Sequence, residues 1–143
     1  MSVLGATVGG MTSKPSDRWR GRVAEEQRQV AAGRLDPAQA YTVRLFPESL
    51  LTATDAALQS FETELAALRD PSDQQVFAAV ERVVLVLNTI NTDHHRGAYE
   101  TGEREELCDY IDRTLGEHGI DVPALASRNG IGAHEITDEW REW

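Results

Sequence analysis

Residues 72–91 read SDQQVFAAVERVVLVLNTIN, and their polar and apolar side chains repeat with the period of an α-helix. Polar pairs return every seven residues, which gives one narrow solvent-facing stripe on a helix and has no counterpart on a strand. The three pairs are Gln74/Gln75, Glu81/Arg82 and Asn88/Thr89. The other faces carry valine, leucine, isoleucine and phenylalanine. We therefore predict that this stretch is the central core helix, in spite of its β-branched residues.

A second amphipathic helix is expected directly before this one. After Pro47, a proline that suits a first helical turn, core-facing side chains recur at intervals of four and three, which predicts a helix of about six turns. They are Thr54, Leu58, Phe61, Leu65 and Leu68. Asp70 and Pro71 then combine the end of one helix with the start of the next, with Asp70 as the cap. These features predict two antiparallel helices joined by a tight turn.

Three shorter helices are expected after residue 100. The first follows Thr101 as its cap and has an acidic first turn, and the second follows Asp121. The last is a short C-terminal helix, because apolar residues stand at positions i, i+4 and i+7 near the end of the chain. These residues are Ile136, Trp140 and Trp143.

The first 46 residues are less regular. Residues 1–16 contain glycines and a proline without any period, so we expect a flexible, disordered tail there. Residues 17–32 carry Trp19 and two valines at helical spacing, which predicts a weakly apolar helix. From Tyr41 to Leu45, apolar and polar residues alternate as they do in a short strand, although no partner strand is expected.

Together these patterns predict an all-α protein that forms a small antiparallel helical bundle. Residues 1–16 are the tail, residues 17–143 form one helical domain, and the core lies within residues 47–143. A hydrophobic fraction of 41% and a charged fraction of 27% are ordinary for a globular domain. The longest apolar run, Val83 to Leu87, is far shorter than the roughly 18 to 20 residues that cross a bilayer as a helix.

Composition also bears on the compartment. The chain does not open with a basic segment followed by a long hydrophobic stretch, so we expect no secretory signal and place the protein in the cytoplasm. Cys108 is the only cysteine, which rules out a disulfide within the chain and a zinc site of several thiolates. Nearly all basic residues are arginines, a bias that is typical of GC-rich bacterial genomes.

The net charge of −10 is unevenly distributed along the chain. Residues 100–143 hold twelve acidic residues against four arginines, whereas residues 1–35 carry a net charge of +3. The acidic part repels nucleic acid and favours a basic protein partner, and the two oppositely charged ends attract each other. Seven residues are therefore candidates for binding a partner. They are Glu103, Glu105, Glu106, Asp109, Asp112, Trp140 and Trp143.

Several of these and other residues have a second interpretation. Large aromatic residues at a chain end either dock onto the core or bind a partner, and docking is the prediction for both tryptophans. Cys108 lies on the predicted inner face of its helix, where a thiol is usually inert.

A metal site needs three or four ligands that converge, and adjacent histidines usually point in different directions. The candidate ligands are Asp93, His94 and His95, with His118 and His134 as further imidazoles.

Two enzymatic or regulatory alternatives follow from charged residues. Paired acids superficially resemble those of helical Mg²⁺-dependent nucleotide pyrophosphohydrolases, but all four lie on one predicted helix and the facing core helix adds only Glu81. The pairs are Glu103/Glu106 and Asp109/Asp112.

Four arginines beside Trp19 are able to contact phosphate, but Glu25 and Glu26 interrupt them. They are Arg18, Arg20, Arg22 and Arg28. The common phosphate-binding and hydrolytic motifs are absent from the sequence, so no cofactor is predicted.

Two segments resemble a family of small acidic helical bacterial proteins, a domain of unknown function: YETGEREELCDYIDRTLGEHGID (Tyr99 to Asp121) and EITDEWREW (Glu135 to Trp143). The resemblance spans residues 47–143 and implies a helical fold but no catalytic residue. The sequence therefore favours a non-enzymatic acidic interaction module, comparable to immunity or antitoxin proteins that neutralise a toxin. A metal-dependent hydrolase that uses the helix carboxylates and a nucleic-acid-linked regulator are the alternatives.

Overall fold

A computed structural model of the protein describes residues 13–94 and 97–143. The protein is an all-α bundle, as predicted, and no strand occurs within these residues. Its α-helices are α2 (Pro15–Ala31), α3 (Thr42–Leu45), α4 (Glu48–Ala67), α5 (Asp73–Asp93), α6 (Thr101–Glu117) and α7 (Val122–Arg128), and its 3₁₀-helices are η1 (Pro37–Gln39) and η2 (Ala133–Glu135). None of the described helices is both long and apolar enough to cross a membrane.

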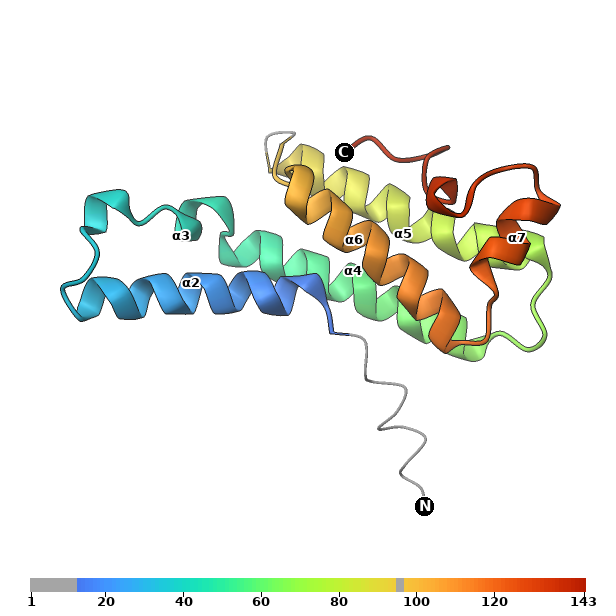
Figure 1. Cartoon of the computed structure of the whole chain (residues 1–143), viewed down its shortest axis with the longest axis horizontal. Helices are drawn as coiled ribbons and strands as arrows, with labels where there is room; N and C mark the ends of the chain where they lie inside the picture. Colours follow the sequence, from blue (N-terminus) through green and yellow to red (C-terminus); the bar gives the residue numbers. More distant parts are fainter. Residues whose placement is uncertain (1–12, 95–96) are drawn as a thin grey trace, which may run out of the picture.

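The antiparallel hairpin of α4 and α5 forms the centre of the bundle (Figure 1). The helix α6 crosses in front of this hairpin, and α2 runs beside α4. The predicted core helix is confirmed as α5, whose inner apolar side chains are at most 6% exposed. These side chains are Val76, Val80, Val83, Val84, Leu87 and Ile90. Burial on this scale is what allows valines to occupy a helix against their intrinsic preference. The predicted polar stripe is wrong at Asn88, which is buried, while Leu85 and Val86 are exposed.

The turn between α4 and α5 is capped by a different residue from the one predicted. Ser72 is the N-cap of α5, and its hydroxyl accepts a hydrogen bond from the Gln75 backbone N–H at 3.1 Å. The Gln75 side chain accepts one in return from the Ser72 backbone N–H at 2.8 Å, which completes a capping box. Asp70 instead adopts a left-handed backbone conformation with φ of 44°. An aspartate tolerates this conformation better than most residues, so Asp70 turns the chain and does not cap the helix.

The helix α2 belongs to the core, although the sequence placed the core within residues 47–143. Trp19 is fully buried, stacks on Phe46 with ring centroids 5.4 Å apart, and lies 6.0 Å from the ring of Tyr99. The helix begins at Pro15, and both Pro15 and Ser16 are buried, so these two residues are not part of a flexible tail. The rest of the predicted tail, up to residue 12, lies outside the described residues.

The strand predicted from Tyr41 to Leu45 is wrong, because residues 42–45 form the short helix α3. Glu26 of α2 supplies the reason: its carboxylate accepts hydrogen bonds from the Thr42 backbone N–H at 2.8 Å and the Thr42 hydroxyl at 2.5 Å. A carboxylate at a helix N-terminus satisfies a free backbone donor and complements the helix dipole. Tyr41 and Val43 are 51% and 45% exposed, so the alternation of apolar residues does not mark a buried face here.

The predicted C-terminal helix does not form, and residues 136–143 follow an irregular path across α5. The side chain of Asn88 on α5 makes two hydrogen bonds to this segment. Its NH₂ group donates to the Trp140 carbonyl at 2.7 Å, and its side-chain oxygen accepts from the Glu142 backbone N–H at 2.9 Å. Trp143 is only 8% exposed and meets the ring of Tyr99 edge-on at 5.8 Å. The backbone N–H groups of residues 138, 140 and 141 make turns within the segment, whereas the Trp140 carbonyl and the Glu142 N–H pair with the Asn88 side chain. The prediction that the tryptophans dock is confirmed.

Candidate functional site

The acidic residues of α6 divide between two faces of the helix. Glu106 points toward α2, where its carboxylate accepts hydrogen bonds from the buried Trp19 indole N–H and from Arg18, both at 2.9 Å. Glu103 lies 3.8 Å from a guanidinium nitrogen of Arg22 and its side chain is only 14% exposed. The predicted attraction between the basic and acidic parts of the chain is therefore observed. Both acids serve contacts within the chain, although the sequence made them candidates for binding a partner.

Three further acids of α6 form a stripe on another face of the helix. Glu105, Asp109 and Asp112 follow one another at i, i+4 and i+7, and all three residues are exposed. Asp109 also forms an ion pair with Arg113, one turn further along, at 3.0 Å. An exposed pair at this spacing stabilises a helix only weakly, so it leaves the carboxylate accessible to other groups. We call these three residues the acidic stripe.

A cleft of about 300 Å³ lies between the acidic stripe and the C-terminal segment. The lining residues on α6 are Cys108, Asp109 and Asp112, and those on the other wall are Ala133, His134, Ile136 and Thr137. The two aspartates lie one helical turn apart on one wall. Because the opposite wall comes from the irregular C-terminal segment, the cleft exists only while that segment is docked on the bundle.

Arg141 ties the C-terminal segment to α6 close to this cleft. Its guanidinium donates to the Cys108 sulfur at 3.0 Å and to the Asp138 carboxylate at 3.2 Å, and it lies 5.3 Å from the centre of the Trp143 ring. Cys108 also lies 3.8 Å from the Thr137 hydroxyl. The predicted inner-face cysteine is therefore partly buried and serves a packing contact.

The electrostatic environment of Asp112 is unfavourable to its charge. Partial burial of the carboxyl, followed by the neighbouring charge of Asp109, raises the pKa of Asp112 above its ordinary value, and Arg113 opposes the effect only in part. No ion-pair partner of Asp112 occurs among residues 13–94 and 97–143. A positively charged group that entered the cleft would offset both the desolvation of the Asp112 carboxylate and its repulsion by Asp109. This is the property expected of a binding carboxylate.

Replacing Asp112 with asparagine is expected to stabilise the protein at neutral pH. The raised pKa means that the folded state binds this proton more tightly than the unfolded chain, so ionisation of Asp112 lowers stability above that pKa. The midpoint of urea unfolding should rise for Asp112→Asn at pH 7, and the gain should vanish as pH falls below the ordinary aspartate pKa of about 3.9. A neutral or destabilising effect at pH 7 would contradict this electrostatic description.

The two tryptophans are poor candidates for direct partner contacts. Trp143 is buried, and Trp140 is partly buried with its ring 6.4 Å from that of Phe77 on α5. The structure therefore places Trp140 and Trp143 with the residues that hold the C-terminal segment in place. Exposed acids of the same segment lie on the outside instead. They are Glu135, Asp138, Glu139 and Glu142.

Within residues 13–94 and 97–143, no set of converging ligands supports the metal and hydrolase alternatives. One imidazole nitrogen of His94 lies 2.8 Å from the Ile90 carbonyl and the other lies 3.0 Å from the Ser49 hydroxyl, while His95 is outside the described residues. In the part of the chain that the structure describes, no three His, Cys, Asp or Glu side chains are grouped so that they could hold a metal ion. Glu103 and Glu106 point away from the cleft that Asp109 and Asp112 line.

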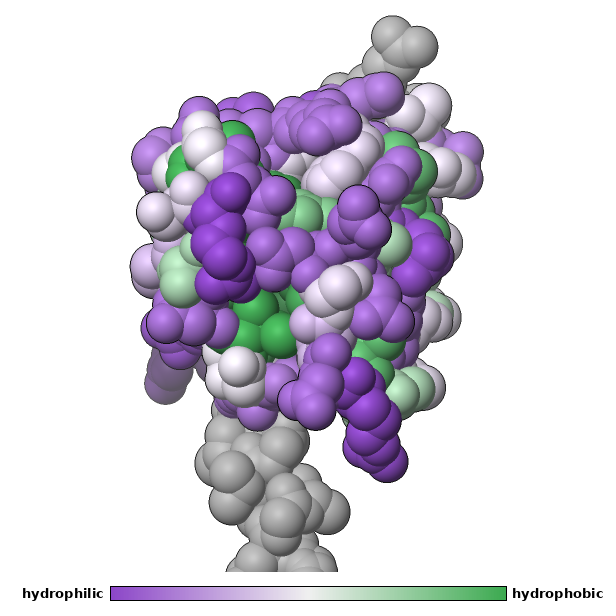
Figure 2. All heavy atoms as spheres, turned by 90° about the vertical axis from the view of Figure 1, so that its right-hand side faces the viewer, coloured by the Kyte–Doolittle hydropathy of each residue, from purple (hydrophilic) through white to green (hydrophobic). Residues whose placement is uncertain are grey.

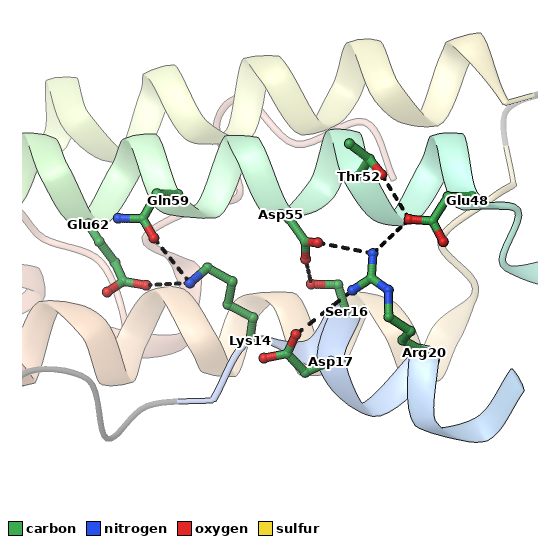
Figure 3. A network of polar contacts seen from close by, with 9 residues as sticks. All are labelled: Lys14, Ser16, Asp17, Arg20, Glu48, Thr52, Asp55, Gln59 and Glu62. Atoms are coloured by element: carbon green, nitrogen blue, oxygen red, sulfur yellow. Dashed lines mark hydrogen bonds and ion pairs between the residues drawn. The ribbon is translucent and has the colours of Figure 1, made fainter. Parts of the chain in front are cut away.

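The arginines of α2 are engaged with carboxylates within the chain, which weakens the nucleic-acid alternative. Figure 3 shows Arg20 between Glu48 and Asp55, with 3.1 Å to each carboxylate, and beside Asp17 at 3.9 Å. In the same network, Ser16 donates to Asp55, and Lys14 lies 3.3 Å from Glu62. The other three arginines pair with acids on α6 or on α2 itself. The pairs are Arg18–Glu106, Arg22–Glu103 and Arg28–Glu25.

Sequence reasoning missed the second wall of the cleft. No periodicity links His134 or Ile136 to Asp109, because the C-terminal segment is irregular and its path is set by Asn88 and Arg141. The surface at the α7 end of the bundle carries its apolar groups as separate small patches among hydrophilic side chains (Figure 2). Apolarity alone therefore does not single out a site at that end, whereas charge and the cleft do.

Comparison with known proteins adds no assignment. No family model matches the chain, and neither a related curated protein nor a similar solved structure is found. The resemblance of residues 47–143 to a family of small acidic bacterial proteins therefore stays a prediction.

Proposed function

We propose that this protein is a cytoplasmic, non-enzymatic interaction module that binds a basic protein surface through the acidic stripe and the adjoining cleft. The comparison is with small acidic immunity or antitoxin proteins, which neutralise a toxin by covering it. The observation that carries the proposal is the exposed row of Glu105, Asp109 and Asp112 beside a cleft, with Asp112 held at an electrostatic cost. Residues that lower stability in the unbound protein are commonly retained for function.

Charge distribution supports the same proposal. The acidic C-terminal part meets an oppositely charged surface favourably, and such complementarity mainly increases the rate and the selectivity of association. The arginines of α2 do not neutralise the acidic stripe. Arg18 and Arg22 pair with Glu106 and Glu103 on the other face of α6, and the other two pair with acids of α4 or of α2 itself. The molecule therefore presents one face of α6 to a partner and uses the other to hold α2.

The cleft favours an arginine side chain as the inserted group. Two carboxylates one turn apart are able to accept hydrogen bonds from the several N–H groups of one guanidinium, and a planar fork of donors suits carboxylates better than a single ammonium. The partly desolvated position of Asp112 strengthens such a contact relative to one in open water. We therefore expect the partner to place an arginine between Asp112 and the C-terminal segment.

Binding of an arginine-rich probe peptide tests the proposal. A hexa-arginine peptide is titrated into the protein by calorimetry, and the triple variant Glu105→Gln/Asp109→Asn/Asp112→Asn is expected to bind it about tenfold more weakly, a loss of roughly 1.4 kcal/mol. The control Glu25→Gln/Asp70→Asn/Glu81→Gln removes three negative charges at other positions of the chain. Both triple variants therefore have the same net charge, −7 in place of −10. The control should stay within about twofold of the unmodified protein.

Two outcomes would contradict the proposal. If both triple variants lose affinity equally, the peptide responds to net charge and the stripe has no special role. If neither loses affinity, the stripe does not bind basic groups at all. Replacing hexa-arginine by hexa-lysine tests the finer statement, because a guanidinium site should prefer the arginine peptide by more than the difference seen with the control variant.

A further inference from the structure

An apolar groove of about 620 Å³ runs between α4 and α5 on the side of α4 that faces away from α2. On α4 the groove is lined mainly by small side chains, together with Phe61 and Glu64, and on α5 it is lined by large ones. The small ones are Ala53, Ala56, Ala57 and Ser60, and the large ones include Val83, Leu85, Val86 and Ile90. Leu85 and Val86 are 45% and 47% exposed, although they stand in the middle of the central helix. A ridge of large apolar side chains therefore lies next to a hollow.

The charged residues around the ridge are arranged symmetrically. Arg82, Val86, Thr89 and Asp93 follow one another along one face of α5, with the cation at one end and the anion at the other. The midpoint of Arg82 and Asp93 falls between residues 87 and 88, about 8 Å from each by the helical rise. Two α5 helices that cross antiparallel at this midpoint place Arg82 of each copy opposite Asp93 of the other.

We infer that a second copy of this chain occupies the groove and that the protein forms a two-fold symmetric dimer through α5. Under that symmetry each copy contributes the same residues, as a two-fold interface requires. Leu85 and Val86 of one copy lie against the small residues of the other copy's groove, and two Arg82–Asp93 ion pairs flank the apolar centre. The burial of exposed leucine and valine side chains drives the association.

Charge also favours a second copy over a basic partner at this surface. The groove is lined by one acid and one base, Glu64 and Arg82, which pair with each other within the chain. It therefore carries no net charge, in contrast to the cleft beside the acidic stripe. A basic partner gains nothing here. Arg82 binds Glu64 through Nε and one terminal nitrogen, and its other terminal nitrogen is the donor that meets Asp93 of the second copy. The groove and the stripe lie on different helices, so a dimer leaves the proposed binding site open.

Sedimentation equilibrium over about 1 to 300 μM protein tests the dimer. The unmodified protein is expected to show a concentration-dependent mass that approaches twice that of the chain. Leu85→Asp should remain monomeric over the whole range, because it places a charge in the apolar centre. Val43→Asp is the matched control, since Val43 is also 45% exposed but lies on α3, and it should dimerise as the unmodified protein does. Circular dichroism confirms that both variants fold.

A double-mutant cycle tests the symmetric ion pairs separately. Asp93→Asn is expected to weaken dimerisation at least threefold in the unmodified protein and to have no further effect in an Arg82→Gln background. A protein that stays monomeric to 300 μM, or a Leu85→Asp variant that still dimerises, would overturn the inference. Additive effects of Asp93→Asn and Arg82→Gln would exclude the antiparallel α5 arrangement. None of these results depends on hexa-arginine binding, so this inference and the proposed function fail or succeed independently.

Discussion

Trp19→Ala is expected to lower the free energy of unfolding by about 3 to 5 kcal/mol. The indole is fully buried, stacks on Phe46 with an angle of 10° between the ring planes, and donates its N–H to Glu106. Its removal leaves a large cavity between α2 and α6 and takes a donor from the Glu106 carboxylate. Urea unfolding followed by circular dichroism measures the loss, because the helical signal reports on the whole bundle.

Two further variants separate packing from hydrogen bonding at this position. Trp19→Phe retains a ring for stacking but removes the indole N–H, and we expect it to cost about 1.5 to 3 kcal/mol, as is typical for a hydrogen bond to a charged group. Trp140→Ala is the comparison, since Trp140 is only partly buried and should cost less than Trp19→Ala. If Trp19→Ala changed stability by less than about 1 kcal/mol, α2 would not belong to the cooperative unit.

Asn88→Leu is expected to cost about 2 to 4 kcal/mol and to release the C-terminal segment from α5. The substitution removes two partly buried hydrogen bonds, those of the Trp140 carbonyl and of the Glu142 N–H, and each contributes about 0.5 to 1.5 kcal/mol. Loss of the docked segment adds the cost of exposing the apolar surface of the two tryptophans. Tryptophan fluorescence should shift to longer wavelength as Trp140 and Trp143 meet water. Since the segment forms one wall of the cleft, affinity for hexa-arginine should fall as well.

Thr89→Ala is the control for this second prediction. Thr89 is the next residue of α5, is exposed, and bonds only to the Leu85 carbonyl of its own helix at 3.3 Å. Its loss should change stability by no more than about 0.5 kcal/mol and leave the fluorescence unchanged. An Asn88→Leu variant with unmodified fluorescence and unmodified peptide affinity would show that packing of the two tryptophans holds the segment without Asn88.

The neighbourhood of Tyr99 shows why the bundle depends on both ends of the chain. Its ring lies between Trp19 of α2 and the C-terminal Trp143, and its hydroxyl is 2.6 Å from that of Thr54 on α4. Burial raises the pKa of Tyr99 to about 12, so the hydroxyl keeps its proton at neutral pH and remains available for this hydrogen bond. One side chain thus joins segments that are more than 120 residues apart in the sequence.

The candidate site could be predicted from the sequence only in part. The excess of acidic residues on α6 is visible in the sequence, but five acids within ten positions do not reveal which of them face a neighbouring helix. Glu106 faces α2 because it binds Trp19 and Arg18, and Glu103 faces α2 because it pairs with Arg22. The remaining stripe of Glu105, Asp109 and Asp112 follows once α2 has been placed. Without α2 in position, all five acids are equivalent candidates.

Periodicity by itself determined that the protein is helical and that residues 72–91 lie at its centre, because a heptad of polar pairs has only one geometric solution. Tertiary structure alone decided that Tyr41 to Leu45 is a helical turn and that the C-terminal residues are irregular. In both places the backbone groups pair with side chains from distant helices, Glu26 for the first and Asn88 for the second. The periodicity of a segment reflects hydrogen bonds within that segment. It contains no information about hydrogen bonds to distant side chains, which form only when the chain folds.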